Sequence, residues 1–254
     1  MTTMVRFAVF CFAICSNLFL IGCGDGGGSS DSAGVSGSKA KLIAMNGDLF
    51  SLASGELIRI DMVDPASPSV TDRYYIGSDA QTLTTDGELL FVGGESSVSN
   101  YRYSQALGFE FISSQQRRVR GRDPVITDGD YAYSTFITQD WGTEDAPDGI
   151  ADLYVYEILE NSALQEIGIY PDLGYLHGLT LWNKNLLVCD YYDGILHFDV
   201  TDPNRVELLN TLSYAPCEDI LHLGNGHIVT VGKQGIFQLM PIEENKLALI
   251  SLYK

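Results

Sequence analysis

The sequence predicts an all-β fold, a five-bladed β-propeller of four-stranded antiparallel blades. The first observation is a turn rich in Asn, Asp and Gly that returns five times, with its middle residue at 47, 87, 129, 184 and 225. Three of the four spacings between these turns are 40–42 residues, which is the period of propeller blades. The second observation is that apolar and polar side chains alternate in several flanking segments, as in half-buried strands. No segment of the body shows helical periodicity.

Each unit is expected to contribute four strands in order. An inner strand comes first and is aligned on Ile43, Leu83, Val125, Leu179 and Leu221. The polar turn follows, since Asn-Gly and Asp-Gly tolerate the positive φ of tight hairpins. Second strands are expected at 49–50, 89–92, 131–133, 186–188 and 227–229. Third strands are expected at 57–61, 99–103, 153–156, 195–199 and 236–239, and the last unit ends in a fourth strand at 247–252.

The third unit is longer than the others by roughly a dozen residues. An insertion of this length in a five-bladed ring is one interpretation. The alternative is a six-bladed ring with one degenerate blade in this unit. No strand is expected to be borrowed from the other terminus, because the last strand belongs to the same unit as its three predecessors.

Two segments share a further turn signature. Residues 58–68 read Ile-Arg-Ile-Asp-Met-Val-Asp-Pro-Ala-Ser-Pro, and residues 196–204 read Leu-His-Phe-Asp-Val-Thr-Asp-Pro-Asn. The Asp side chain can accept a backbone hydrogen bond ahead of it and proline presets φ, so both Asp-Pro steps predict turns. The segments resemble the LVIVD repeat, although Val206 replaces the final proline of the second. The resemblance implies a bacterial or archaeal surface propeller, and it brings no catalytic residues.

The N-terminus has the parts of an export signal. Arg6 precedes an apolar run that is too short to span a bilayer, and Leu-Ile-Gly-Cys ends at Cys23. This ending matches the lipobox of bacterial lipoproteins, so we expect residues 1–22 to be a signal peptide and Cys23 to carry lipid. Residues 23–39 are expected to be a Gly/Ser-rich tether, and residues 40–254 the propeller.

The expected lipid anchor places the protein at a membrane. Lipoproteins retained at the inner membrane tend to have Asp directly after the cysteine, whereas this chain has Gly24. The outer membrane is therefore favoured if the organism has two membranes. An ordinary signal peptide is the alternative.

Charge and cysteine content narrow the partners. The net charge is −18, which argues against nucleic acid, because nucleic-acid binding needs basic patches. A surface protein or a polysaccharide is the kind of partner that this composition allows. Cys189 and Cys217 are the two thiols left in the body, and an exported protein can join them as a disulfide. Two separate buried thiols are the alternative.

Polar residues recur two positions before the aligned residue of each inner strand: Lys41, Gln81, Asp123, His177 and Asp219. Inner strands line the channel of a propeller, so all five side chains are expected at the channel mouth. Convergent polar groups of this kind suit a small ligand or an ion. The alternative is an ordinary hydrated channel mouth.

The long loop of the third unit is acidic. Its carboxylates are hard oxygen ligands that suit calcium, and the candidate ligands are Glu144, Asp145, Asp148 and Asp152. The match to a calcium loop is partial, because Val155 stands where a bidentate Glu is required. A solvated acidic loop is the alternative, and no other cofactor is indicated.

Aromatic residues also fall in predicted loops of the mouth: Trp141, Tyr175, Tyr191 and Tyr192. They could stack on sugar rings, with Asp190 and Asp193 as hydrogen-bond partners. Packing between blades is the alternative.

We therefore expect a non-catalytic lipoprotein whose mouth face binds a protein, a glycan or an ion. No nucleophile elbow, zinc-protease motif or phosphate-binding glycine loop is present. The alternative is a hydrolase of sugars or lactones that uses His177 as a base with carboxylates at the channel mouth.

Overall fold

The computed structural model describes residues 38–117, 121–122, 124–138, 151–224, 226–243 and 246–254. The chain divides into two units, Met1–Asp31 and Ser32–Lys254. The first unit, and with it the expected signal peptide and Cys23, lies outside the described residues. The rest of this section concerns the second unit.

In the described residues, twenty-one strands form five antiparallel sheets, each built from consecutive strands. Sheet one holds β1 (Leu42–Met45), β2 (Asp48–Ala53), β3 (Glu56–Asp61) and β4 (Ser69–Tyr75). Sheet two holds β5 (Ala80–Thr85), β6 (Leu89–Gly94), β7 (Ser97–Ser104) and β8 (Gly108–Gln116). Sheet three holds β10 (Val125–Thr127), β11 (Tyr131–Thr138), β12 (Ala151–Ile158) and β13 (Leu164–Tyr170).

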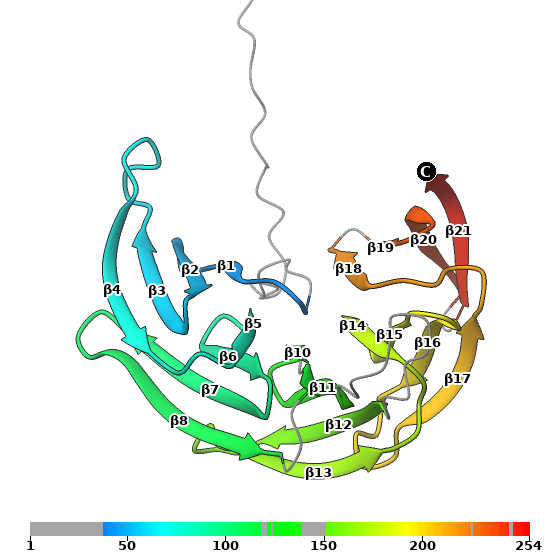
Figure 1. The fold of residues 1–254 in the computed structure, drawn as a ribbon, viewed down its shortest axis with the longest axis horizontal. Coiled ribbons are helices and arrows are strands. Elements are labelled where there is room, and N and C mark those ends of the chain that lie inside the picture. Colours follow the sequence, from blue (N-terminus) through cyan, green and yellow to red (C-terminus); the bar gives the residue numbers. More distant parts are fainter. Residues whose placement is uncertain (1–37, 118–120, 123, 139–150, 225, 244–245) are drawn as a thin grey trace, which may run out of the picture. The chain divides into compact units, whose positions relative to one another are not determined.

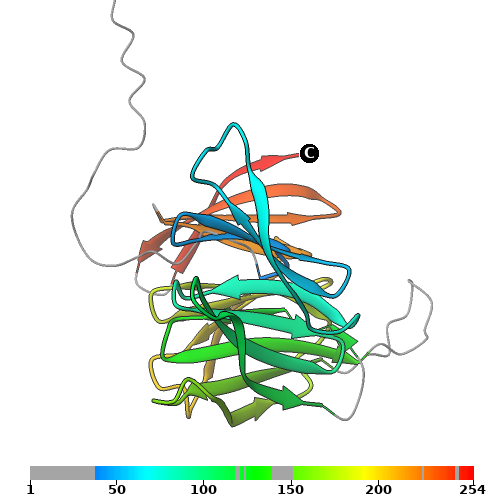
Figure 2. The ribbon, with the colours of Figure 1, turned by 90° about the vertical axis from the view of Figure 1, so that its left-hand side faces the viewer.

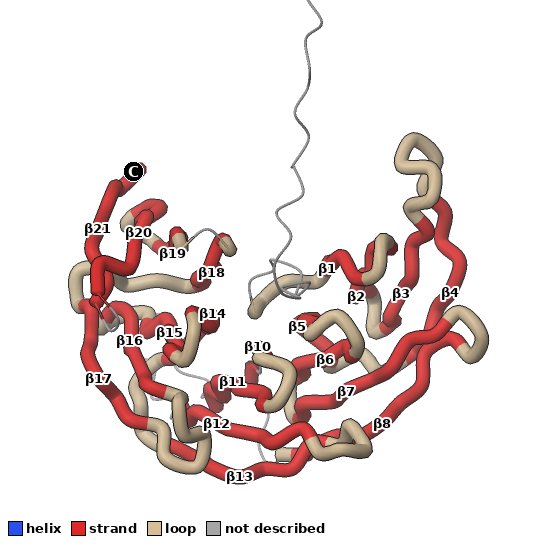
Figure 3. The backbone as a smooth tube through the Cα atoms, turned by 180° about the vertical axis from the view of Figure 1, so that it is seen from behind, coloured by secondary structure: helices blue, strands red, loops and turns tan. Residues whose placement is uncertain are grey.

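Sheets four and five complete the unit. Sheet four holds β14 (Leu176–Trp182), β15 (Asn185–Asp190), β16 (Gly194–Asp199) and β17 (Glu207–Leu212). Sheet five holds β18 (Asp219–Leu223), β19 (His227–Gly232), β20 (Gly235–Glu243) and β21 (Lys246–Tyr253). In the part of the chain that the structure describes, every regular element is a strand, and no helix is long and apolar enough to cross a membrane (Figure 3).

The predicted five blades are confirmed, with one added element. The two-residue strand β9 (Gly121–Arg122) pairs with β11 and makes sheet three five-stranded. The described residues of the long third unit thus form one sheet, not the two that the six-bladed alternative requires. The insertion itself, residues 139–150, is not among them.

The hydrophobic core lies between sheets rather than inside one. Four buried clusters fill the four boundaries between consecutive sheets, anchored for example by Phe50, Phe91, Leu179 and Phe237. The sheets therefore stack face to face around the inner strands β1, β5, β10, β14 and β18 (Figures 1 and 2). Among the described residues no buried cluster joins sheet one to sheet five.

Turn chemistry matches the sequence prediction. Gly87 has φ 96°, and Asp86 Oδ1 accepts the backbone N–H groups of Glu88 and Leu89 at 2.8 and 2.7 Å. In the two Asp-Pro turns, Asp64 and Asp202 each accept a backbone N–H two residues ahead at 3.1 Å. These short local bonds explain why the same turn recurs wherever the sequence repeats.

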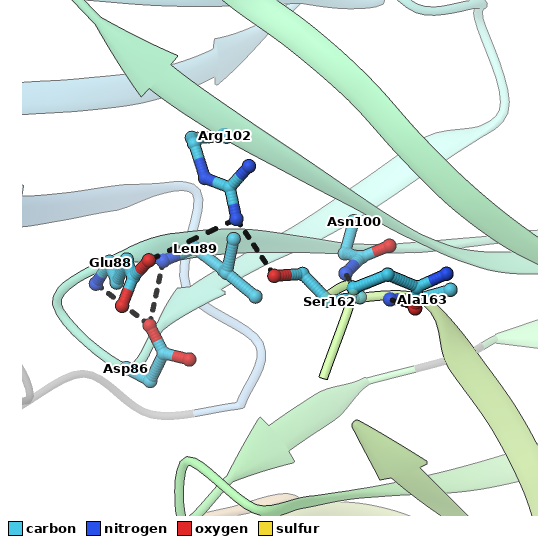
Figure 4. A network of polar contacts seen from close by, with 8 residues as sticks. Asp86, Glu88, Leu89, Asn100, Arg102, Ser162 and Ala163 are labelled. Carbon is cyan, nitrogen blue, oxygen red and sulfur yellow. Dashed lines mark hydrogen bonds and ion pairs between the residues drawn. The ribbon is translucent and has the colours of Figure 1, made fainter. Parts of the chain in front are cut away.

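Polar contacts also bind neighbouring sheets. Figure 4 shows Asn100 and Arg102 of β7 reaching the β12–β13 turn. Asn100 Nδ2 donates to the carbonyl of Ser162 at 2.6 Å, and Arg102 Nη2 donates to Ser162 Oγ at 2.8 Å. Asn100 is fully buried, so this bond satisfies a group that would otherwise be costly to bury. The boundary between sheets two and three is therefore fixed by polar as well as apolar contacts.

Candidate functional site

The inner strands begin on one face of the propeller, which we call the mouth face. This face also carries the turns between second and third strands and the connections between sheets. The predicted channel-mouth residues lie at or near these strand starts. Lys41 directly precedes β1 and is exposed, Gln81 is half-buried in β5, His177 is buried in β14, and Asp219 opens β18. The fifth, Asp123, lies outside the described residues.

The structure brings one of these residues, His177, into contact with Lys39, which lies in the expected tether. The Lys39 ammonium is 2.9 Å from His177 Nδ1. An ammonium group only donates, so Nδ1 accepts and the neutral imidazole carries its proton on Nε2. Burial raises the pKa of Asp219, and the positive charge of Lys39 opposes that shift. Lys39 thus contacts sheet four through His177 and acts electrostatically on Asp219 of sheet five.

The segment before β1 is tied to three sheets. Ser38 is fully buried, and its Oγ accepts the backbone N–H of Leu179 at 2.8 Å. The carbonyl of Ala40 accepts from Leu83 N at 2.7 Å, and that of Lys41 accepts from Leu52 N at 2.8 Å. Ser38 and Lys39, which the sequence assigns to the tether, are therefore held against the sheets by backbone and side-chain bonds.

Close approach between sheets four and five requires a glycine. A Cβ on Gly178 would lie 2.1 Å from Asp219 Oδ1 and 2.9 Å from Asp219 Cα. Gly178 N also donates to the carbonyl of Glu218 at 3.1 Å. On the other side, Thr135 Oγ1 donates to the carbonyl of His177 at 2.7 Å. The backbone that carries His177 is thus held from sheets three and five.

An aromatic cluster surrounds His177. Its ring stacks on Tyr191, with centroids 5.4 Å apart and an interplanar angle of 27°, and lies 5.1 Å from Tyr175. Tyr192 stands edge-on to Tyr191 at 4.9 Å and 80°. Lys233 Nζ lies 4.7 Å from the centroid of Tyr191. The predicted loop aromatics therefore gather beside the channel mouth, except Trp141, which is not among the described residues.

Asp190, one of the two carboxylates considered as sugar partners, is buried and supports the loops. It is 1% exposed, and its carboxylate binds backbone on both tyrosine-bearing loops. Oδ2 accepts from Tyr175 N at 2.9 Å, while Oδ1 accepts from Tyr192 N at 2.8 Å and Asp193 N at 2.7 Å. A Cβ on Gly174, where φ is +94°, would lie 2.3 Å from Oδ2. Asp190 therefore positions the cluster, and Asp193 remains exposed.

A pocket of about 260 Å³ opens next to this cluster. Its walls come from two neighbouring turns and the connection between sheets four and five, and include Tyr191, Tyr192, Pro216, Glu218, Lys233 and Gln234. Cys217 also lines it and is joined to Cys189 by a disulfide, with Cα atoms 5.2 Å apart. The disulfide links the connection to the strand that precedes Tyr191.

The calcium ligands are not brought together by the described residues. Glu144, Asp145 and Asp148 lie outside them. Asp152, in β12, is half-buried, and its oxygens lie 3.4 Å from Tyr154 Oη and from Asp172 N. In the part of the chain that is described, no three His, Cys, Asp or Glu side chains form a group suited to a metal. The calcium site stays a prediction.

Four residues of the site were missed from the sequence: Lys39, Glu218, Lys233 and Gln234. A signal existed for two of them. Lys233-Gln234 occupies in the fifth unit the turn that Tyr191-Tyr192 occupies in the fourth, and the two turns are 42 residues apart. Aligning these two turns would have predicted that Lys233 and Gln234 lie beside Tyr191 and Tyr192.

The comparisons with known proteins support the fold. No protein-family model matches the chain, and no curated protein matches its sequence. A solved protein from Lactobacillus plantarum has a TM-score of 0.59 at 16% identity, covering 83% of this chain and 67% of its own. A functionally unknown protein from Desulfotomaculum acetoxidans has a TM-score of 0.60 at 12% identity, and the match covers 82% of this chain and 68% of that one.

A third solved structure is the periplasmic gluconolactonase PpgL of Pseudomonas aeruginosa. Its TM-score is 0.59 at 12% identity, and the match covers 86% of this chain and 66% of that one. The chain thus spans about two thirds of the length of the structures it matches. At these identities the likeness establishes a shared β-propeller fold and nothing about chemistry.

Proposed function

We propose that this chain is a lipid-anchored, non-catalytic propeller that binds a component of the cell envelope on its mouth face. The observation that carries the proposal is Lys39, whose ammonium group lies 2.9 Å from His177 Nδ1 and whose charge lowers the pKa of Asp219 against the effect of burial. A hydrolase would need that histidine and carboxylate turned toward a substrate. Here Lys39 of the chain itself, and not a substrate, contacts His177. Tyr191 stacks on His177 and also lines the pocket.

Anchoring through Cys23 fits the position of Ser38. Fourteen residues separate them, and a fully extended segment of that length spans about 50 Å. We also propose, on the two Asp-Pro turns, that the repeats belong with LVIVD-like propellers.

Membrane attachment is tested separately. Globomycin treatment should block cleavage before Cys23 and accumulate the precursor, and C23S should prevent lipid attachment. Normal cleavage under globomycin, or lipid attachment in C23S, would contradict the lipid anchor.

Binding is tested by sedimentation of the full mature chain, carrying C23S for solubility, with membrane-free envelope fragments. K233E reverses a charge on the mouth face, and K184E is the matched control at an exposed lysine of the opposite turn face. We expect K233E to lose binding and K184E to keep it. If K233E binds as well as K184E does, the mouth face is excluded as the binding surface.

The catalytic alternative is tested with sugar lactones and aryl glycosides. We expect no turnover by the mature chain or by K39A, which removes the partner of His177. Turnover that disappears in H177A would overturn the non-catalytic proposal.

A further inference from the structure

We propose that the pocket beside the mouth binds a single neutral pyranose ring, the kind of unit that ends or branches a polysaccharide. This inference rests on the proposed binding function and names its ligand. It is carried by three properties of the pocket, which are its aromatic wall, its polar groups, and its size and charge balance.

The aromatic wall is Tyr192. Its side chain lines the pocket and is 48% exposed, a large apolar surface to leave in water. The ring is edge-on to Tyr191 at 4.9 Å and tilted against Tyr175 at 5.8 Å, and the Tyr192 backbone N–H donates to Asp190. A tyrosine fixed in this way offers contact area at low entropic cost. The C–H face of a pyranose is a flat apolar surface that matches it.

The polar groups stand on the other walls. Glu218 is half-buried between sheets four and five, and Gln234 is exposed at the turn of sheet five. A carboxylate accepts hydrogen bonds, whereas an amide both donates and accepts. The hydroxyl groups at the edge of a pyranose do both as well. An apolar wall with a few polar groups that fix orientation is the usual form of a small-ligand site.

Size and charge select the ligand further. At about 260 Å³ the pocket is smaller than the roughly 300–1,000 Å³ of sites for drug-sized molecules, so it suits one ring and not an extended chain. Glu218 and Lys233 place one negative and one positive charge in its walls. A charged sugar is attracted by one of these side chains and repelled by the other. The net charge of −18 further disfavours a negatively charged uronate.

The test is calorimetry and saturation-transfer NMR on the full mature chain carrying C23S. The probes are methyl glycosides of glucose, galactose, mannose and N-acetylglucosamine, with glucuronic acid as the charged comparison. We expect at least one neutral glycoside to bind more tightly than glucuronic acid. E218Q removes the carboxylate charge and should reduce the difference in affinity between the neutral glycoside and glucuronic acid.

Two tyrosine variants locate the site. Y192A should weaken binding at least tenfold, whereas Y214A, at a tyrosine of similar exposure outside the pocket, should change it less than twofold. Circular dichroism checks that both variants fold. If Y192A does not fold, Q234A replaces it, because that side chain is exposed and should lower affinity without disturbing the core.

Each outcome has one meaning. Glycoside binding that is unchanged in both Y192A and Q234A overturns the pocket assignment. Tighter binding of glucuronic acid overturns the neutral class. If no sugar binds while envelope fragments still bind in a Lys233-dependent way, the sugar proposal fails and the binding function stands. If neither binds, both proposals fail.

Discussion

Replacing Asp190 with alanine removes the carboxylate that holds both tyrosine-bearing loops. Three backbone N–H groups lose their acceptor, those of Tyr175, Tyr192 and Asp193. Each buried donor left unsatisfied costs about 1–3 kcal/mol. Asp193 is exposed, so water can reach part of this network and repay part of the loss. We therefore expect D190A to lower the free energy of unfolding by about 3–5 kcal/mol.

The assay is urea unfolding followed by circular dichroism, with D193A as the control. Asp193 is the adjacent carboxylate but is exposed, so its replacement should change the free energy of unfolding by less than about 0.5 kcal/mol. D190N keeps one acceptor oxygen and should fall between the two. A loss below about 1 kcal/mol in D190A would refute the view that this carboxylate organises the aromatic cluster.

Three further predictions concern other parts of the molecule. Replacing Cys189 and Cys217 by serine opens a link across 28 residues and should lower the free energy of unfolding by about 3–4 kcal/mol; an unchanged urea midpoint would contradict this. Burial raises the pKa of Asp219 above 3.8, so the folded state holds the proton more tightly and stability should fall as pH rises above 3.8. D219N should remove that slope in pH-dependent urea unfolding, and a slope that persists would exclude Asp219 as its source. Calcium titrated into the mature chain should release heat that D148A abolishes, and identical heats would remove the loop site.

The fold was predictable because its signals are local. An Asp-Gly turn is specified by the left-handed preference of glycine and by bonds to the next two or three residues, as at Asp86 and Gly87. Neither the glycine preference nor these hydrogen bonds depend on residues distant in sequence. The same holds for the Asp-Pro turn at Asp64. Five polar turns, three of whose four spacings match a blade, predicted the five sheets, and among the described strands only the short β9 was not predicted.

Parts of the site were not predictable, because they depend on contacts distant in sequence. Ser38 and Lys39 follow a Gly/Ser-rich segment, and composition cannot reveal that Lys39 meets a histidine 138 residues later. From the sequence, Asp190 next to two tyrosines fits a carboxylate that binds a sugar as well as one that holds the loop backbone. Its burial decides between these roles, and burial is set by how sheet four meets the following connection.

The turns between second and third strands explain why a repetitive fold can hold one localised site. Such a turn needs only to reverse the chain, so its side chains can differ from unit to unit without cost to the sheet. Unit one uses Ser54-Gly55 there, unit four Tyr191-Tyr192 and unit five Lys233-Gln234. The pocket forms where two different turns adjoin, and the disulfide at Cys217 secures the connection between them. The repeated strands therefore supply the scaffold, and the departures from repetition supply the recognition chemistry.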